Sequence, residues 1–447
     1  MRRRGWGIAT AVTVIAVMSW EVPALAMAAG QARQAGPSSS VRVLRIYYQS
    51  PVLVRAGERV SMPVQVVCAT ATGKACDASI SLGIRAGNGD VWRFRRVEAR
   101  PGLTFDLSAP AARAASSAGA QSVDFAFQAD ADGVDTVLPA SGLAPLKFYA
   151  TRRIQTLRVP AVPFGRVKQG RTVVSLPWGS GPRRVGLELG REAPTLGPPA
   201  FDVDRAGHVI LLDALQGRVA EFEGARLLRQ WPVHADPSSD VAVAGDDTTY
   251  VSQEVRGELS VSRRTRSGRG LGTVSLGPAM LSQLRAGVSS AFAELLPLDA
   301  WVRIAGRGPE SELAPIAGRP VSSGGRLLRV GTERYVRLGV VRAERVESAV
   351  ELRSSYRFGE VALAEPDGSG GYVVVVRMWT PSPPMDQFQV IHVSKGRVAE
   401  TFAASSRSFA ASLPLSRFRL GRDGRLYQMV SEPRGVRIVR FEMKGES

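Results

Sequence analysis

The first third of the chain contains short runs in which apolar and polar residues alternate with a period of two. Between Val60 and Val66 every second residue is apolar, and the residues between them are serine, proline and glutamine. This alternation is typical of a β-strand that buries one face. Strands are predicted in the same way over residues 41–47, 60–67, 79–85, 91–97, 103–107, 122–129 and 145–151.

One helical turn interrupts these strands. Ser108 and Pro110 stand ahead of an alanine-rich run that reaches Ala115, and a serine cap with a proline in the first turn is typical of a helix N-terminus. Strands of this length, with a helical turn between the late pair, describe a β-sandwich over residues 41–152. It resembles the immunoglobulin fold in architecture only, because the sequence lacks the widely spaced cysteine pair.

A different pattern begins after a bridge over residues 152–163. Residues 201–222 read as strand, turn ending at Gly207, strand, turn at Gly217, and a strand that closes on Phe222. Weaker copies continue to the end of the chain. A recurring unit of this kind cannot bury both faces alone, so it must stack against its siblings.

The repeats can be counted from their turn residues. Gly207, Asp247, Gly368 and Gly424 mark four units, with intervals of 40, 121 and 56 residues between them. The middle interval is close to three times the first, so two degenerate units are expected within it, at residues 293–305 and 325–341. We therefore predict an all-β protein in which a six-bladed β-propeller over residues 160–445 follows the sandwich.

The clearest unit resembles a known repeat family. Its Asp-x-x-Gly-x-φφφ-x-Asp run (φ, apolar), from Asp204 to Asp213, with Gly217 and the closing Phe222, is similar to an NHL-type propeller repeat. The last unit departs from that pattern, because Val430 and Ser431 stand where an aspartate is expected. The resemblance implies a propeller fold and says little about function.

Residues 1–28 have the pattern of an export signal. Three arginines precede an uncharged, mostly apolar stretch from Trp6 to Trp20, and small residues lead to cleavage after Ala26 or Ala28. The stretch is shorter than the ~20 residues of a spanning helix, which disfavours the alternative of a retained anchor. We expect an extracytoplasmic protein, secreted or cell-surface associated, with no transmembrane segment in the mature chain and a flexible tether over residues 29–40.

Cys68 and Cys76 are the only cysteines in the sequence. In an exported protein the default expectation is a disulfide that pins a hairpin. The alternative, a reactive or metal-binding pair, fits poorly because the spacing is too wide for a Cys-x-x-Cys site and no histidine is near.

The formal charge of +18 comes almost entirely from arginine, a bias typical of a GC-rich genome. A basic exported protein accumulates at anionic surfaces, so an anionic cell-surface polymer is one candidate partner. The compartment and the lack of stacking aromatics among the basic residues disfavour nucleic acid, so we expect no nucleic-acid partner. The densest basic run, residues 263–269, is either an exposed hairpin tip or an adhesion site for such a polymer.

No catalytic or metal motif stands out. Asp202, Asp204, Gly207 and Asp213 match positions 1, 3, 6 and 12 of an EF-hand calcium loop, but strands flank them, so a blade hairpin is the preferred interpretation. The three histidines are far apart, and each lacks a partner at metal-ligand spacing. The sequence predicts no catalytic residue, no metal ligand and no cofactor.

The segment entering the first repeat is the best candidate site. In a propeller, this connection crosses one axial face. Here it is rich in glycine and proline and carries Trp178, Arg183, Arg191 and Glu192. These four residues form either a binding surface or a blade-closing loop with solvated charges.

The favoured hypothesis is a non-enzymatic binding or scaffold protein that engages a protein or glycan through a propeller face. The alternative is a propeller hydrolase or lyase that acts on a lactone, sugar or peptide with a divalent cation in the central channel. An enzyme would require at least three Asp, Glu, Asn or His side chains that converge on the axis. A purely structural surface-layer component is a third possibility.

Overall fold

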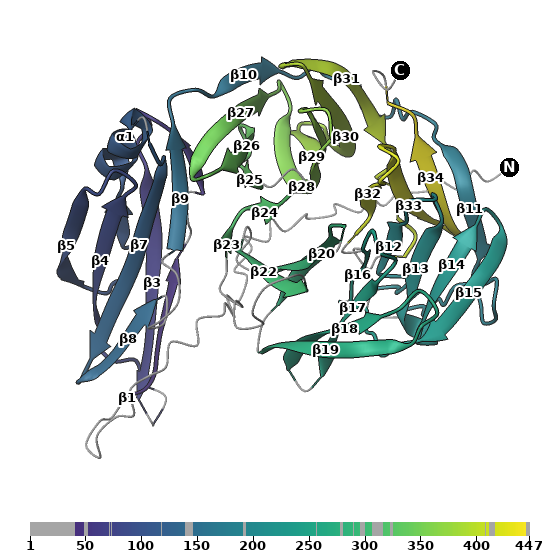
Figure 1. Cartoon of the computed structure of the whole chain (residues 1–447), viewed down its shortest axis with the longest axis horizontal. Helices are drawn as coiled ribbons and strands as arrows, with labels where there is room; N and C mark the ends of the chain where they lie inside the picture. Colours follow the sequence, from purple (N-terminus) through teal and green to yellow (C-terminus); the bar gives the residue numbers. More distant parts are fainter. Residues whose placement is uncertain are drawn as a thin grey trace, which may run out of the picture.

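The computed structural model shows an all-β protein in which a β-sandwich precedes a six-bladed β-propeller (Figure 1). The structure describes residues 41–48, 52–70, 72, 74–117, 119–138, 146–190, 194–255, 257–277, 280–288, 290–295, 300–305, 316–321, 325–406, 408–410 and 416–443. The predicted export signal and tether lie outside the described residues. No helix among them is long and apolar enough to cross a membrane.

The sandwich consists of two sheets, one in the order β1-β3-β6 and one in the order β2-β9-β7-β4-β5, with β8 paired to β7. The strands are β1 (Val41–Tyr48), β2 (Leu53–Arg55), β3 (Ser61–Thr70), β4 (Ser79–Ala86), β5 (Val91–Glu98), β6 (Thr104–Asp106), β7 (Ser122–Ala131), β8 (Val134–Leu138) and β9 (Leu146–Thr151). Every predicted strand is present. Sequence analysis missed β2, which is too short to show a period, and β8, whose buried face includes the polar Thr136.

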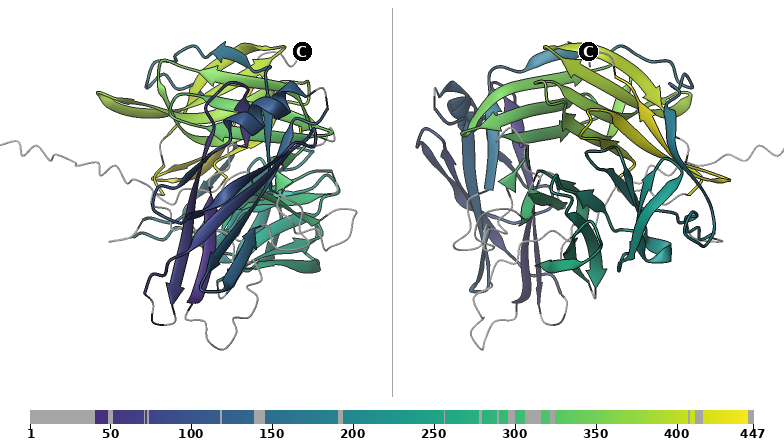
Figure 2. Two further views of the ribbon diagram at one scale, coloured as in Figure 1. Left: turned by 90° about the vertical axis from the view of Figure 1, so that its left-hand side faces the viewer. Right: turned by 45° about the vertical axis from the view of Figure 1, so that its right-hand side comes forward.

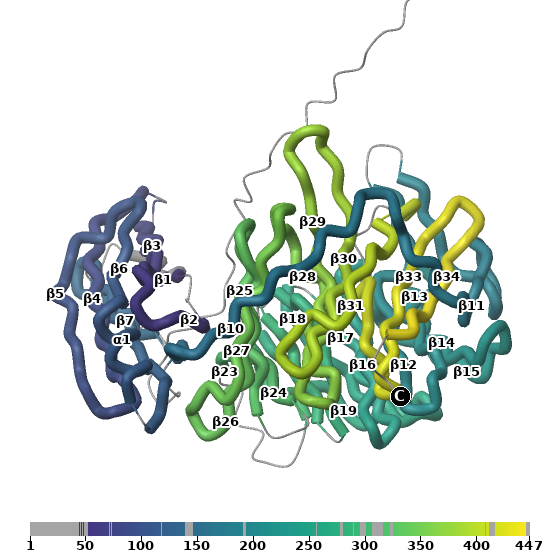
Figure 3. Tube along the Cα trace, turned by 90° about the horizontal axis from the view of Figure 1, so that it is seen from above, coloured from purple at the N-terminus to yellow at the C-terminus, as the bar shows by residue number. Residues whose placement is uncertain are grey.

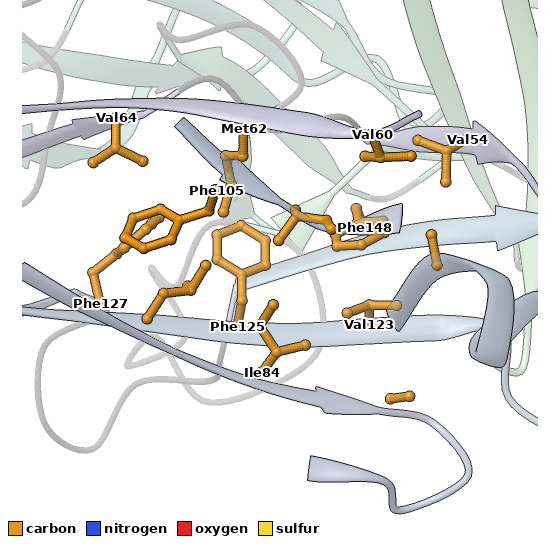
Figure 4. Close-up of a cluster of buried hydrophobic side chains, with 14 of the residues drawn as sticks. Val54, Val60, Met62, Val64, Ile84, Phe105, Val123, Phe125, Phe127 and Phe148 are labelled. Carbon is orange, nitrogen blue, oxygen red and sulfur yellow. The ribbon is translucent and has the colours of Figure 1, made fainter. Parts of the chain in front are cut away.

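Apolar side chains of both sheets meet in one core. Met62 and Val64 of β3 face Phe125 and Phe127 of β7 across the sandwich (Figure 4). The rings of Phe125 and Phe127 lie edge to face at 5.8 Å. This geometry is favourable for aromatic pairs, so the phenylalanines contribute packing beyond simple burial.

Helix α1 (Ser108–Ser116) covers one end of the core with its buried alanines. Pro110 lies in its first turn as predicted. The predicted serine cap is wrong, because Leu107 occupies the N-cap position and makes no side-chain cap. The Ser108 hydroxyl instead accepts a hydrogen bond from the Val60 N–H at 2.9 Å, which ties the helix to the start of β3.

Cys68 and Cys76 form the predicted disulfide. The loop between them folds back on β3, because Ala69 and Ala75 form an antiparallel bridge. The disulfide therefore closes a hairpin at the end of the sandwich.

Six sheets form the propeller. From the innermost to the outermost strand, the blades are: blade 1, β12 (Ala200–Val203), β13 (Val209–Asp213), β14 (Arg218–Glu223) and β15 (Arg226–Pro232); blade 2, β16 (Val241–Val243), β17 (Thr249–Val255), β18 (Glu258–Arg264) and β19 (Gly270–Gly277); blade 3, β20 (Leu281–Ala286), β21 (Ala291–Leu295), β22 (Ala300–Ala305) and β23 (Ile316–Ala317); blade 4, β24 (Arg319–Pro320), β25 (Arg326–Gly331), β26 (Val336–Arg342) and β27 (Arg345–Arg353); blade 5, β28 (Arg357–Pro366), β29 (Tyr372–Pro381), β30 (Pro384–Ser394) and β31 (Arg397–Ala404); blade 6, β32 (Phe418–Leu420), β33 (Leu426–Glu432), β34 (Gly435–Phe441) and β11 (Arg171–Pro177). The predicted number of blades is confirmed.

The ring is closed by strands from opposite ends of the repeat region. β11 precedes blade 1 in the chain, yet it pairs antiparallel with β34 as the outermost strand of blade 6. Ala200 at the start of β12 also forms a bridge with Ser416, just before β32. Blade 6 therefore contains chain from both sides of the other five blades.

The turn residues that marked the repeats in the sequence occupy equivalent positions in blades 1 and 5. Asp204 accepts the N–H groups of Ala206 and His208 with one carboxylate oxygen, both at 2.8 Å. Asp367 accepts two N–H groups in the same way, at 2.8 Å each, two and four residues further along the chain. Gly207 and Gly368 have φ of 84° and 79° in these turns, a conformation that favours glycine. The degenerate units expected at residues 293–305 and 325–341 lie in blades 3 and 4.

The chain between the two parts runs along the outside of the propeller (Figure 3). β10 (Gln155–Arg158) joins blade 4 as a fifth strand, parallel to β27. Further on, Gln389 of blade 5 donates to the Pro160 carbonyl at 2.8 Å, and the Lys168 N–H donates to the Ala403 carbonyl at 2.9 Å. The bridge is thus bonded to blades 4 and 5 along its length. The domain limits of 41–152 and 160–445 remain predictions.

The sandwich stands beside blade 4 (Figure 2), and ion pairs join the two. Arg337 of β26, whose side chain is only 1% exposed, lies 2.7 Å from Glu58 of the sandwich and 2.5 Å from Glu351 of β27. Glu344, in the turn between β26 and β27, accepts hydrogen bonds from Lys147 at 3.2 Å and Tyr149 at 2.9 Å, both on β9.

Glu344 gives this interface a pH dependence. Burial alone would raise the pKa of its carboxyl, but Arg326 and Lys147 outweigh burial and hold that pKa below its usual value. A depressed pKa contributes stability above the unfolded-state value of ~4.3, and this stability is lost as the pH falls through the folded-state value. Glu344→Gln is therefore expected to lower the free energy of unfolding by about 1 kcal/mol or less at pH 7, because the pair is partly exposed, and to have no effect near pH 3.

Urea unfolding of both proteins at pH 7, 5 and 3 measures this difference. Glu347→Gln, an exposed residue of β27 that pairs with Arg342, serves as the control and should stay close to wild type at each pH. A Glu344→Gln difference that is independent of pH would contradict the assignment.

Candidate functional site

The strand order gives the propeller two different faces. On one face, each outermost strand leads to the next innermost strand, and second strands turn into third strands. We call it the connection face, and the opposite one the turn face. Figure 3 shows the β29–β30 hairpin of blade 5 extending beyond the other blades on the connection face.

Exposed apolar side chains gather on the connection face. Among the described residues, the propeller has seven large apolar side chains with high exposure, and five of them belong to this face. They are Leu189 (67% exposed), Val255 (50%), Met280 (43%), Met385 (42%) and Phe409 (39%). The other two, Leu271 and Val288, belong to the turn face. Apolar groups concentrated on one face are typical of a protein-binding surface.

The segment that carries Trp178 is fixed by blade 1. At the end of β13, Asp213 accepts the Gly186 N–H at 3.2 Å. Arg218 donates to the Gly181 carbonyl at 2.9 Å, and Gln216, in the short 3-10 helix Ala214–Gln216, donates to the Gly179 carbonyl at 3.1 Å. Burial raises the pKa of Asp213, and Arg218 opposes that shift. The motif residues of the repeat thus hold the connection rigid.

Trp178 is an anchored side chain rather than a fully exposed one. Its indole N–H donates to the Glu432 carbonyl at 2.8 Å, and its ring rests against Gly197, where an added Cβ would come within 3.3 Å of it. The exposed ring of Phe409 lies 6.4 Å from it, centroid to centroid. Phe409 comes from the connection between blades 5 and 6, and no sequence spacing relates it to Trp178.

Of the other predicted site residues, Arg183 lies exposed on the same segment. Arg191 and Glu192 lie outside the described residues. The structure therefore places Trp178 and Arg183 on one face and adds Phe409 and Leu189 to them.

Arg419, on the innermost strand of blade 6, joins four blades across the ring. Its guanidinium donates to the Phe201 carbonyl of blade 1 at 2.8 Å and to the Leu284 carbonyl of blade 3 at 3.1 Å. It also pairs at 2.7 Å with Asp240, which leads into blade 2 and is completely buried. Asp240 in turn accepts the Leu284 N–H at 2.7 Å.

A second ion cluster joins blades 3, 4 and 5. Arg285 lies 3.0 Å from one oxygen of Glu365, and Arg319 contacts the other oxygen. Burial raises the pKa of Glu365, and Arg319 opposes it. Asp202 is shared between blades 1 and 2, because it accepts the Val243 N–H at 2.8 Å; burial raises its pKa, with Arg419 opposing.

The innermost strands therefore carry both acids and arginines. Asp202, Asp240 and Glu365 meet the count of polar groups that an enzyme would require. Each of them already accepts hydrogen bonds from a neighbouring blade or from an arginine, so their arrangement serves to hold the ring together.

One cluster on the turn face has metal-ligand geometry. Single ligand atoms of Asp204, His208 and Glu221 lie within 4.8 Å of one another. Arg266, from the next blade, reaches all three: its Nη2 lies 3.1 Å from Asp204, 3.0 Å from His208 Nδ1 and 2.6 Å from Glu221. The guanidinium therefore supplies the positive charge that these carboxylates would otherwise take from a cation.

This cluster corrects two sequence interpretations. His208 does have carboxylate partners, since Asp204 lies four residues away at 2.9 Å. The tip of the basic run is not simply solvated, because Arg266 at its centre is bound to blade 1. The EF-hand count is also resolved in favour of the hairpin: Asp202, Asp204 and Asp213 bond to three separate parts of the backbone.

No protein-family model and no curated protein matches this sequence. Several solved structures are similar in fold. A protein of unknown function from Bacteroides caccae is 14% identical, with 50% of this chain and 86% of that chain covered and a TM-score of 0.35. A streptogramin B lyase is 8% identical, with coverage of 57% and 96% and a TM-score of 0.30. A PQQ-bound aldose sugar dehydrogenase from Streptomyces coelicolor is 9% identical, with coverage of 61% and 97% and a TM-score of 0.33.

These neighbours include β-propeller proteins, and at such identities and TM-scores they carry no argument about chemistry. The NHL family itself is matched by no model, so that resemblance stays a prediction. The class that fold and site define is an all-β protein with a β-sandwich and a six-bladed β-propeller.

Proposed function

We propose that this protein is an exported binding or scaffold protein whose propeller engages a protein partner through the connection face. The observation that carries the proposal is that five of the seven exposed large apolar side chains of the described propeller belong to that face, together with the anchored Trp178. Protein interfaces are enriched in aromatic residues, methionine and arginine, which Phe409, Met385 and Arg183 supply here. A glycan partner is the less favoured form of the same hypothesis.

The arrangement along the ring axis supports binding over catalysis. A hydrolase or lyase with a divalent cation in the channel needs carboxylates that are open to a ligand. Asp240 and Glu365 are instead held by Arg419, Arg285 and Arg319. Converting these groups to cation ligands would require breaking the contacts that join the blades.

The sandwich would act as the positioning part of the scaffold. The ion pairs Arg337–Glu58 and Glu344–Lys147 fix it to blade 4, so the sandwich would set the orientation of the propeller relative to the surface that the sandwich contacts. Its outer strand β5 presents the exposed Arg93 and Arg95 at the edge of a sheet. This edge is suited to an anionic cell-surface polymer, whose binding would weaken in high salt.

The double variant Leu189→Ser with Phe409→Ser tests the proposal. Removing two exposed apolar side chains from the binding face is expected to weaken partner binding at least about tenfold and to leave the unfolding midpoint nearly unchanged. The measurement compares which proteins from the producing cell's envelope are captured by immobilised wild type and by the variant, followed by affinity determination.

Val288→Ser is the matched control, since Val288 is 66% exposed but belongs to the turn face. Partners lost by the double variant and kept by Val288→Ser support the connection face. Partners kept equally by both variants would contradict it.

A further inference from the structure

Arg417 lies where the connection from blade 5 enters blade 6. It directly precedes β32, and the neighbouring Ser416 fixes the backbone by donating to both carboxylate oxygens of Asp240, at 2.9 and 3.0 Å. The same connection carries the exposed Phe409. Arg417 is thus held on the connection face, beside the surface described above.

The guanidinium of Arg417 has few partners. It lies over the ring of Phe388, 5.2 Å from the centroid, and within the described residues its hydrogen bond to the Ser406 carbonyl is long, at 3.5 Å. Arg419, two residues along, makes four shorter bonds. A guanidinium has five N–H donors, so most of those of Arg417 remain available among the described residues.

The nearby carboxylates do not supply the partner that the guanidinium of Arg417 lacks. Glu360 is exposed, and within the described part of the chain no carboxylate lies within ion-pair distance of Arg417. Asp386 on the β29–β30 hairpin is engaged by Arg377 at 2.6 Å. Residues 411–415, Ala-Ser-Leu-Pro-Leu, contain no acid. Burial lowers the pKa of Arg417, and Glu360 only partly opposes the shift. Holding a half-buried cation without an ion pair costs stability.

We propose that Arg417 is a carboxylate-binding residue at the connection face, which receives an acidic side chain or a C-terminal carboxylate of the protein partner. The inference rests on the proposed function, because it assigns the chemistry of the same surface. The half-buried guanidinium, stacked on Phe388 and lacking a carboxylate of its own, is the observation that carries it.

The geometry of arginine favours a carboxylate. The planar guanidinium presents two parallel N–H groups along one edge, which match the two oxygens of a carboxylate. Phe388 covers one flat side of the group and leaves its edges available. Phe409 on the same connection and Met385 on the β29–β30 hairpin are exposed on this face and would contact apolar groups of the same partner.

Thermal unfolding in sodium acetate and in sodium chloride, at equal concentration and pH, tests this without any partner. Acetate at 0.5 M is expected to raise the Tm of the wild type by about 2–4 °C over chloride, because it binds only the folded state. Arg417→Met is expected to abolish this increment. In chloride its Tm should equal or exceed that of the wild type, since the variant removes an uncompensated buried charge.

Arg434→Met, which removes an exposed arginine from the same face of blade 6, is the control and should keep the acetate increment. An increment that persists in Arg417→Met, or a large drop in its Tm in chloride, would overturn the proposal, the latter because it indicates a structural role. Because phosphate stabilises proteins generally, its increment is compared in both proteins: a phosphate increment that is lost in Arg417→Met as completely as that of acetate would overturn the assignment to carboxylates. The acetate test uses no partner protein. A negative acetate result therefore rejects the role of Arg417 alone, whereas a negative capture result rejects the proposed binding face.

Discussion

Replacing Arg419 with methionine is expected to lower the free energy of unfolding by about 3–5 kcal/mol. The change leaves Asp240, which is completely buried, without its cation, and it removes the hydrogen bonds from Arg419 to the carbonyls of Phe201 and Leu284. Removing one partner of a buried ion pair leaves the other charge buried and unpaired. This costs more stability than the intact pair contributes. Chemical denaturation followed by intrinsic fluorescence measures the loss.

Arg425→Met provides the comparison. Arg425 also pairs with two carboxylates, Asp423 and Glu442, but it is 38% exposed. Its loss should cost about 1 kcal/mol or less, because water screens such pairs. Combining Arg419→Met with Asp240→Asn should recover part of the stability, since residue 240 then carries no unpaired charge. If Arg419→Met and Arg425→Met lowered the free energy of unfolding by the same small amount, Arg419 would not be the residue that joins the blades.

The second large effect is expected at the interface between sandwich and propeller. Arg337→Met removes the buried guanidinium that contacts Glu58, Glu351 and the Leu53 carbonyl. We expect a loss of about 3 kcal/mol and the separation of a single unfolding transition into two, because the sandwich then unfolds independently of the ring. Differential scanning calorimetry resolves the transitions.

Arg353→Met is the matched control for that variant. Arg353 contacts the same Glu351 at 2.7 Å, but from a position that is 57% exposed and on the propeller side only. It should leave a single transition. Two transitions in the wild type, or one in Arg337→Met, would show that the ion pair does not couple the two parts.

The fold could be predicted because its information is local. Alternation along β3 and the turn residues Gly207, Asp247, Gly368 and Gly424 each report on a few neighbouring residues, and backbone geometry dictates them. Blades 3 and 4 were the hardest to recognise, since β23 and β24 contain two residues each and show no period. Their presence followed only from the length of the interval.

The candidate site could be predicted only in part, because its contacts are distant in sequence. Trp178 was found from the composition of its segment, whereas Phe409 joins it through the closure of the ring. Arg419 and Asp240 are ordinary residues in the sequence, and only the meeting of the innermost strands gives them a role. The arginine that reaches Asp204, His208 and Glu221 belongs to another blade, so the sequence suggested a solvated tip instead.

The position of β11 has a consequence for how the protein is made. A ribosome releases β11 long before β34, the strand with which it pairs, has been synthesised. Until residues 435–441 have been synthesised, β11 has no strand to pair with, and the nascent ring stays open. Premature termination before Gly435 would therefore do more than shorten blade 6, because β11 would stay unpaired and the ring would not close.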